Sequence, residues 1–92
     1  MAHDMAYSMA YRLARDVQVR KEAWGLLFYR QAEHKVYFIR SGEWLVPEHF
    51  DGTWTLEKLS EDIAKRTGAP AEYINNALPK LTERLTANRM LL

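Results

Sequence analysis

Two apolar runs separated by a short connection constrain the fold of this chain more than any other feature. They lie in the stretch WGLLFYRQAEHKVYFIR, residues 24–40. Residues 24–30 and 35–40 predict the two strands of a hairpin, and the four residues between them, 31–34, match a loop length that is common in hairpins. A local antiparallel pair is therefore the starting point for the fold.

The second run, residues 35–40, is apolar on both of its faces. Side chains alternate along a strand, so Tyr37 and Ile39 lie on one face and Val36 and Phe38 on the other. Small antiparallel sheets usually keep one face in water. The sequence therefore raises the question of what covers the second face. The alternatives are the N-terminal segment, a second copy of the chain and a bound partner.

Strands are predicted on the N-terminal side of the chain. The segment YRLARDVQVR, residues 11–20, reads as a first extended segment, because its valines are two residues apart with polar neighbours. The stretch SGEWLVPEHFDG is ambiguous: it either continues the third strand or makes a short helical turn near residues 47–50. Asp51-Gly52 indicates a turn.

Two helices with clear boundaries follow. Thr55 can cap the first helix, Gly68 ends it in a left-handed conformation, and Pro70 opens the second helix in its first turn. Pro79 lies inside the second helix and predicts a kink there. The apolar stripes of the two helices are Leu56, Leu59 and Ile63, and then Ile74, Leu78, Leu81 and Leu85.

The order of these elements predicts the fold class. Three short strands followed by three helices, counting the turn near residues 47–50, indicate an α+β fold of the winged helix-turn-helix type. We expect a three-stranded antiparallel sheet followed by a three-helix bundle. With 92 residues the chain makes one domain, residues 11–92, after a flexible N-terminal segment, residues 1–10. We expect residues 90–92 to pack back against the strands.

Composition excludes several classes of protein. The chain has no cysteine, which excludes a disulfide scaffold, a cysteine-ligated zinc site and an iron–sulfur cluster of its own. No apolar run approaches the roughly 18–20 residues of a membrane span, and the N-terminus lacks the pattern of a signal peptide. We therefore expect a cytoplasmic protein without a membrane partner.

Residues that could carry catalysis are scattered. His3, His34 and His49 show no metal-ligand spacing, and we expect each of them to be exposed to solvent. The serines Ser8, Ser41 and Ser60 lack an arrangement of partners, and the four glycines occur singly at turns. The sequence predicts a protein that is not an enzyme and that uses no metal and no cofactor.

Charge is segregated along the chain although the net charge is only +1. Residues 11–40 are mainly basic, residues 43–62 are mainly acidic, and the last thirty residues are basic again. A charged face is ordinarily just a solvated face. The alternative is that the basic hairpin and the basic last helix meet and receive an acidic partner.

Several stretches together resemble one protein family. YRLARDVQVR resembles an opening Leu-Ala-Pro-Gly-Val segment, and GLLFY and KVYFI stand where the second and third strands of that family lie. DGTWTLEKLSEDIAKR is similar to its Asp-Gly-(Arg/Thr)-x-Thr-x-x-Glu-(Leu/Ile) stretch, and LTERLTANRMLL to its closing Leu-x-x-Leu-x-x-x-Gly-Leu-Leu. On these motifs the chain resembles the PqqD-like proteins, also called RiPP recognition elements, and its hairpin is closest to the mycofactocin-type recognition proteins.

The sequence departs from the family pattern at three places. Ala69 stands where an Asp or Ser commonly caps the last helix, Arg89 replaces the closing glycine, and the first helix is reduced to a short segment that bears a tryptophan.

The resemblance implies a function. Such proteins act as peptide-modification chaperones: they bind the leader of a ribosomally made precursor peptide, which adds as an extra strand to the third strand, and they commonly serve a radical S-adenosylmethionine maturase. The implied peptide-binding residues are, from the strand, Lys35, Val36, Tyr37, Phe38, Ile39 and Arg40, and, from one flank of the last helix, Tyr73, Ala77, Lys80, Leu81 and Arg84.

Two other functions, and the possibility of a homodimer, stay open. Winged-helix folds often bind DNA, but residues 55–68 hold three basic against three acidic side chains, which argues against a nucleic-acid partner. A scaffold subunit of an enzyme is the second rival, and a free leader peptide would not bind to it alone. A homodimer is compatible with the two apolar faces of residues 35–40.

Overall fold

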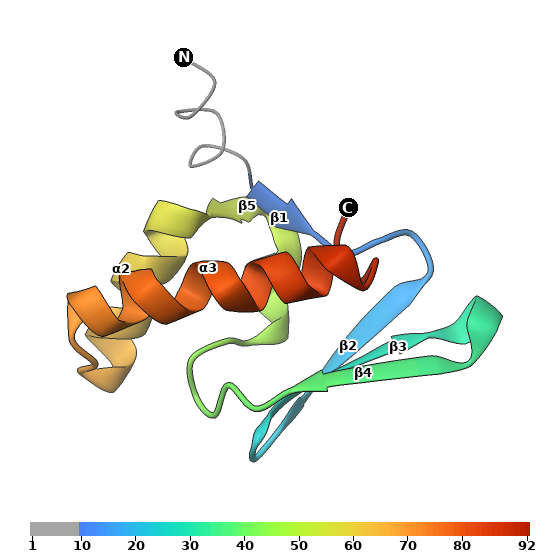
Figure 1. The fold of residues 1–92 in the computed structure, drawn as a ribbon, viewed down its shortest axis with the longest axis horizontal. Helices are drawn as coiled ribbons and strands as arrows, with labels where there is room; N and C mark the ends of the chain where they lie inside the picture. The colour runs from blue at the N-terminus through green and yellow to red at the C-terminus, as the bar shows by residue number, and fades with distance from the viewer. Residues whose placement is uncertain (1–9) are drawn as a thin grey trace.

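A three-stranded antiparallel sheet forms one half of the molecule. The computed structural model describes residues 10–92, and the sheet consists of β2 (Val17–Glu22), β3 (Gly25–Arg30) and β4 (Lys35–Ile39) in the order β2-β3-β4 (Figure 1). The loop between β3 and β4 contains the 3₁₀ turn η1 (Gln31–Glu33). The predicted hairpin is confirmed, and so is the α+β class.

A second, two-stranded sheet was not predicted. It pairs β1 (Ala10–Arg12) with β5 (Asp51–Thr55), which joins segments far apart in the sequence. Residues 11–20 are therefore not one extended segment, because a turn separates β1 from β2 and the Val17 N–H donates to the Ala14 carbonyl at 3.1 Å. The expected Asp51-Gly52 turn is the beginning of β5. Of the N-terminal segment predicted as residues 1–10, only Ala10 lies within the described part of the chain, and it begins β1.

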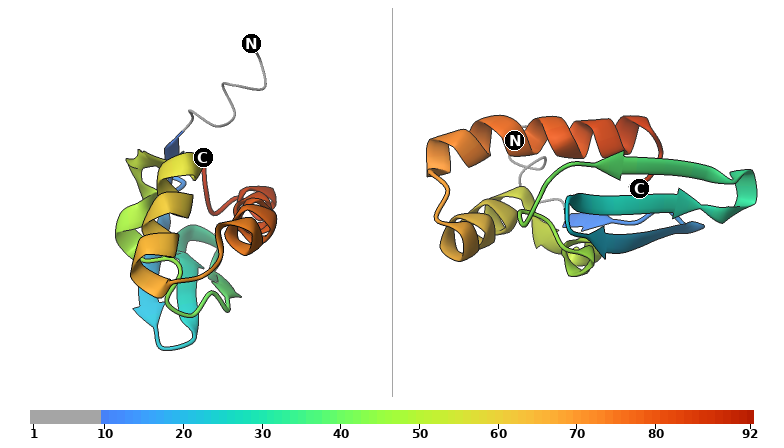
Figure 2. Two further views of the ribbon diagram at one scale, coloured as in Figure 1. Left: turned by 90° about the vertical axis from the view of Figure 1, so that its left-hand side faces the viewer. Right: turned by 90° about the horizontal axis from the view of Figure 1, so that it is seen from below.

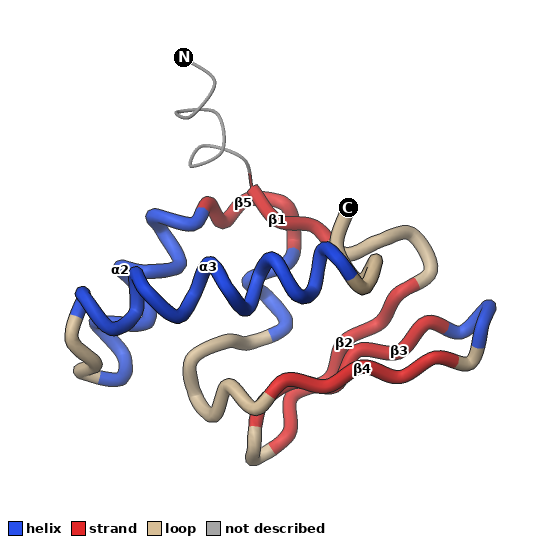
Figure 3. Tube along the Cα trace, viewed as in Figure 1, coloured by secondary structure: helices blue, strands red, loops and turns tan. Residues whose placement is uncertain are grey.

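Two helices follow the strands, not three. They are α2 (Leu56–Thr67) and α3 (Ala71–Ala87), and the loop between β4 and β5 holds only the 3₁₀ turn η2 (Pro47–Phe50) (Figure 3). The three-helix bundle was wrong, because the chain becomes extended at Asp51 to pair with β1 directly after this single turn. The short helical turn near residues 47–50 is confirmed.

The predicted helix boundaries are close to the observed ones. The Thr55 hydroxyl accepts the Lys58 N–H at 3.2 Å, and Gly68 ends α2 with a φ of 74°. Pro70 precedes α3 as its N-cap instead of standing in its first turn. From there α3 continues through Pro79 as one helix to Ala87, and the Thr82 hydroxyl donates to the Pro79 carbonyl at 3.0 Å.

The core lies between the three-stranded sheet and the helices. α3 runs alongside the sheet, and α2 packs against α3 (Figure 2). The fully buried side chains include Leu26, Phe28 and Ile39 of the sheet, Leu59 and Ile63 of α2, and Ile74, Leu78 and Leu85 of α3.

Two details of the predicted core differ from the structure. Leu81 is only partly buried, and Thr82 takes the buried position beside it, where its hydroxyl is 3.4 Å from that of Tyr11. At the C-terminus, Met90 and Leu91 are buried as predicted, and Leu91 bridges to Leu13. Leu92 is 74% exposed.

Candidate functional site

The outer edge of β4 has no strand beside it within residues 10–92. Two backbone hydrogen bonds fix which peptide groups point to this edge. The Gly42 N–H donates to the Trp24 carbonyl at 3.0 Å, on the β4 side of β3, and the Gln31 N–H donates to the Asp16 carbonyl at 3.4 Å, on the β2 side. Backbone groups alternate along a strand, so the even-numbered residues of β3 face β4.

This alternation identifies the free backbone groups of β4. Leu26 pairs with Ile39 and Phe28 pairs with Tyr37, so these β4 residues direct their N–H and C=O groups toward β3. Val36 and Phe38 consequently direct theirs outward. An exposed edge of this kind offers unpaired donors and acceptors to another extended chain.

The side chains of β4 divide between two faces as the sequence predicts. Ile39 is 1% exposed and belongs to the core, and Tyr37 is packed against the core. Val36 and Phe38 project from the opposite face and are 55% and 51% exposed. The core therefore covers the face of Tyr37 and Ile39, and the second apolar face stays open in the described part of the chain.

A cleft lies between β4 and α3, and we call it the β4–α3 cleft. It consists of two hollows of about 490 and 500 Å³, and Arg84, on the lining of the first, donates from Nε to the hydroxyl of Tyr37, on the lining of the second, at 3.3 Å. The first hollow is lined by six of the predicted residues: Arg40, Tyr73, Ala77, Lys80, Leu81 and Arg84. The lining of the second includes three more of the predicted residues, Lys35, Val36 and Tyr37, and the charged side chains of Arg30, Glu33 and Arg89. Phe38 and Ile39 line neither hollow.

The first hollow is basic and partly aromatic. Its lining includes the cations of Arg40, Lys80 and Arg84, and no carboxylate belongs to the described residues that line it. The rings of Trp44 and Tyr73 meet edge to face with their centres 5.5 Å apart, and Tyr73 is 62% exposed. This surface suits an extended, acidic chain that also carries apolar side chains.

Sequence reasoning missed three residues of this hollow. Asn76 stands three residues after Tyr73 on the same flank of α3, so helical spacing alone could have found it. Ser41 and Trp44 lie in the loop after β4, where no periodicity predicts a direction. The Ser41 hydroxyl is buried and has no hydrogen-bond partner among the described residues.

A buried histidine holds the loop that carries Trp44. His49 was expected to be exposed, but its side chain is 1% exposed. Its Nδ1 accepts the Val46 N–H at 3.1 Å, and its Nε2 lies 2.9 Å from Asp62 Oδ2. The same carboxylate oxygen accepts from Arg66 Nε at 2.8 Å.

Arg66 extends this network to the loop itself. Its terminal nitrogens donate to the Glu43 and Trp44 carbonyls at 2.8 and 2.6 Å. The expectation of an exposed histidine failed because the side-chain partner of His49, Asp62, comes from α2 and cannot be recognised from the residues next to His49. The network fixes one wall of the β4–α3 cleft. Of the other histidines, His34 is exposed as expected, and His3 lies outside the described residues.

The protonation of this network follows from its surroundings. Burial lowers the pKa of His49, and the hydrogen bond that its ring donates to Asp62 only partly opposes that effect. Burial alone would raise the pKa of Asp62, but hydrogen bonds from Arg66 and His49 outweigh it and hold the pKa of this carboxyl below its usual value. His49 is therefore neutral with its proton on Nε2, and Asp62 is charged.

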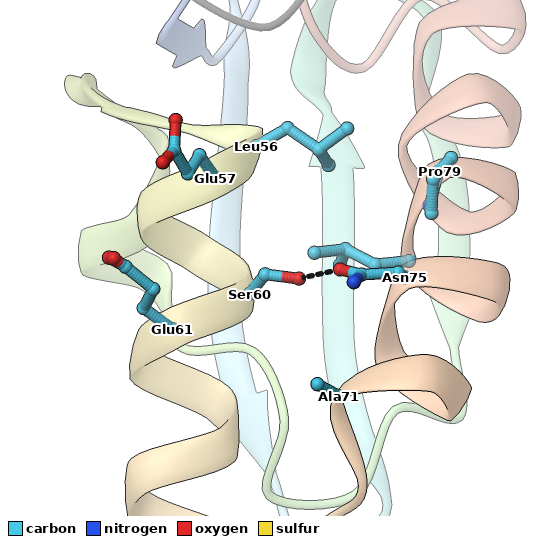
Figure 4. Close-up of a pocket in the computed structure, with 8 residues that line it drawn as sticks. Leu56, Glu57, Ser60, Glu61, Ala71, Asn75 and Pro79 are labelled. Atoms are coloured by element: carbon cyan, nitrogen blue, oxygen red, sulfur yellow. Dashed lines mark hydrogen bonds between the residues drawn. The ribbon is translucent and has the colours of Figure 1, made fainter.

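A second groove lies on the other flank of α3, between α2 and α3. It has a volume of about 490 Å³. Figure 4 shows Leu56 and Ser60 reaching from α2 toward α3, where the Ser60 hydroxyl donates to Asn75 Oδ1 at 2.6 Å. Glu57 and Glu61 stand on the outer side of α2, and no cation belongs to the described residues that line this groove. We call it the α2–α3 groove.

The described residues do not assemble a metal site or a membrane span. In residues 10–92, no group of three or more His, Asp or Glu side chains could hold a metal ion. No helix in this part of the chain is both long and apolar enough to cross a bilayer.

Comparison with known proteins gives no relative. The chain matches no described protein family, no curated protein and no solved structure. The resemblance to PqqD-like proteins therefore stays a prediction, and the function has to be argued from the β4 edge and the cleft beside it.

Proposed function

We propose that this protein binds an extended, acidic peptide as an added strand on the outer edge of β4, against α3, and that it catalyses no reaction itself. One observation carries the proposal: the strand whose residues Val36 and Phe38 direct backbone groups outward continues, at Arg40, into a hollow that is lined by three cations and by no described carboxylate. Strand addition uses the free backbone groups for affinity and the side chains of the cleft for specificity.

The size of the cleft fits a single added strand. β4 has five residues and therefore spans about 17 Å at roughly 3.4 Å per residue. Alternate side chains of an added strand would point toward α3 and into the two hollows of the cleft. The side chains between them would point to the open face, next to Val36 and Phe38.

The charges of the cleft favour an acidic peptide. Arg40, Lys80 and Arg84 are all exposed, so each contributes more to the rate of association and to the choice of partner than to affinity. The resemblance to RiPP recognition elements points to the same ligand class, the leader of a ribosomally made precursor peptide. In that setting the peptide would be presented to a modifying enzyme, a radical S-adenosylmethionine maturase.

The rival functions lack a comparable surface. In a winged-helix DNA-binding protein, a helix with a basic face enters the major groove, whereas α2 presents Glu57 and Glu61 beside the α2–α3 groove. A scaffold subunit without peptide affinity would have no use for a free strand edge beside a basic cleft. Binding of a peptide to the isolated protein separates this second rival from the proposal.

The proposal can be tested on the isolated protein with a synthetic probe. The probe is a seven-residue peptide, acetyl-Glu-Leu-Asp-Ile-Glu-Leu-Asp-amide, and its control replaces each acidic residue with lysine. In NMR titrations we expect the acidic peptide to shift the amide signals of Val36, Phe38 and Lys80 and to slow amide exchange at the first two. Equal shifts with the lysine peptide, or shifts that spare β4, would contradict the proposal.

A further inference from the structure

The open face of the hairpin carries a continuous apolar patch that extends from β4 over β3, beyond the edge used in the proposed function. The patch consists of Trp24, Leu27, Tyr29, Val36 and Phe38, and we call it the hairpin patch. Phe38 lies opposite Leu27 and Val36 lies opposite Tyr29 in the register of β3 and β4. The ring of Trp24, which is 41% exposed, meets that of Phe38 edge to face with their centres 5.6 Å apart.

The area of the hairpin patch is that of an interface. A large aromatic side chain presents about 200 Å², so the half-exposed Trp24 and Phe38 offer roughly 100 Å² each. With the other three side chains the patch reaches about 300–400 Å², a size at which exposed apolar surface is often functional. One side of a standard interface buries about 800 Å², of which roughly 57% is apolar. The hairpin patch supplies most of that apolar share.

The patch lies beside a hollow on the same face of the sheet. Val36 and Phe38 form a ridge along β4. Beside the ridge, over β2 and β3, lies a hollow of about 430 Å³ whose lining includes Arg20, Leu27 and Tyr29. A ridge and a hollow side by side on one face allow two identical copies to fill each other's hollow.

We infer that the hairpin patch docks a second copy of this chain, and that the two copies pack face to face about a two-fold axis. An axis parallel to the strands, between β3 and β4, places the ridge of each copy over the hollow of the other. Because Phe38 and Leu27 are at the same level of the sheet, this axis brings Phe38 of each copy against Leu27 of the other. Two sheets that stack face to face in this way lie about 10 Å apart.

The charges around the hollow permit this contact. The Arg20 guanidinium pairs with the Glu22 carboxylate at 2.6 Å, so this pair presents no net charge to the second copy. The packing also leaves both β4 edges and both β4–α3 clefts open at the sides of the dimer. The dimer is thus compatible with the proposed peptide binding but does not depend on it.

Sedimentation of the purified chain, without any peptide, tests the inference. Between about 10 µM and 1 mM we expect the average mass to rise from that of the 10.8 kDa monomer toward twice that value, as for an interface of modest size. Phe38→Glu should raise the dissociation constant at least tenfold. Tyr73→Glu, which changes an exposed aromatic residue outside the patch, should leave it within twofold. A wild-type chain that stays monomeric at 1 mM, or a Phe38→Glu variant that associates normally, would overturn the inference.

A mixing experiment tests the two-fold arrangement. Phe38→Glu and Leu27→Lys chains should each be monomeric. In an equimolar mixture the new carboxylate of one chain would meet the new ammonium of the other, while the second contact keeps its native Phe38 and Leu27. We expect the mixture to associate where neither chain does alone. Circular dichroism spectra like those of the wild type establish that both variants fold, and no association in the mixture would overturn this arrangement.

Discussion

The two flanks of α3 border hollows of the same size and opposite character. The first hollow of the β4–α3 cleft and the α2–α3 groove each measure about 490 Å³. The first hollow of the cleft carries three cations on its lining, whereas the groove carries two glutamates. The cleft is bounded by a strand with free backbone groups, and the groove is bounded by two helices whose backbone groups are largely bonded within each helix.

Volume alone therefore does not distinguish the cleft from the groove as a place where a peptide could bind. A groove between helices can bind a ligand only through side chains, because each helix satisfies its own N–H and C=O groups except at its ends and at proline. A strand edge provides a row of donors and acceptors at a spacing that matches another extended chain. Only the β4 flank of α3 therefore offers free main-chain groups, and cations line the first hollow beside it.

We expect the largest effects from proline substitutions in β4, which remove backbone N–H groups from the strand. Ile39→Pro removes an N–H that faces β3, so we expect it to destabilise the fold by about 3 kcal/mol or more. Phe38→Pro removes an N–H that faces outward, so the fold should survive with a loss of less than about 1 kcal/mol, because an edge strand tolerates proline on its open side. Thermal unfolding of both variants checks the orientation of the backbone.

Peptide binding should respond in a way that stability does not. Phe38→Pro should weaken binding of the acidic probe at least about tenfold, because a peptide carbonyl loses its donor. Phe38→Thr keeps the backbone N–H and serves as the control, with affinity close to that of the wild type. If Phe38→Pro binds normally, strand addition at this edge is wrong.

Filling one hollow at a time should give the next largest effect. Ala77 lines the cleft and Ala71 lines the groove, both on α3. Ala77→Trp occupies the space needed by the peptide, and we expect affinity to fall about tenfold or more, a loss of roughly 1.4 kcal/mol. Ala71→Trp fills the groove and should leave affinity within twofold. Isothermal titration with the acidic probe measures both, and equal losses would mean that the cleft is not the binding site.

Removing charge should have a smaller effect that depends on salt. We expect Lys80→Ala combined with Arg84→Ala to weaken binding about three- to thirtyfold at low salt, because each exposed contact contributes roughly 0.2–1 kcal/mol. The loss should appear mainly as slower association and should shrink as salt rises. Glu57→Gln combined with Glu61→Gln is the matched control in the groove. A loss that is the same at low and high salt would mean that this flank of α3 is only a solvated surface.

The sequence predicts those parts of the molecule whose signals are local. The hairpin follows from two apolar runs and a short loop, the ends of α2 follow from Thr55 and Gly68, and the basic flank of α3 follows from helical spacing. In each case the deciding residues are neighbours in the chain or stand one helical turn apart. The positions of Tyr73, Ala77, Lys80 and Arg84 could be named for that reason.

The parts that escaped prediction depend on contacts between distant segments. β1 and β5 pair across some forty residues, and β5 starts at a dipeptide that by itself indicates a turn. Ser41 and Trp44 line the cleft because Arg66 donates to carbonyls of the loop that leads from β4 to η2 and so holds this loop in place. The burial of His49 likewise depends on Asp62. Propensity cannot report a conformation whose hydrogen-bond partners are chosen by the tertiary fold.

The network of His49, Asp62 and Arg66 should make the stability of the fold and the loop beside the cleft depend on pH, whereas the α2–α3 groove should not respond. The pKa of His49 is lower in the folded state than in the unfolded state, so the unfolded state binds the proton more readily as pH falls. The stability that depends on neutral His49 is fully present above about pH 6.5 and is lost as the pH falls from there through the folded pKa. We expect a modest effect, because the hydrogen bond from His49 to Asp62 opposes the effect of burial on the pKa of His49. Urea unfolding at pH 7.5 and 5.5 measures it: His49→Gln should flatten the difference in stability between the two pH values, whereas His34→Gln, at an exposed site, should not.

Protonated His49 can no longer accept the Val46 N–H, so the loop that carries Trp44 should loosen in the same pH range. NMR signals of the Trp44 indole should therefore shift with pH while those of Ser60 and Asn75 in the groove stay fixed, and signals that move together would show that the network does not act on the cleft alone.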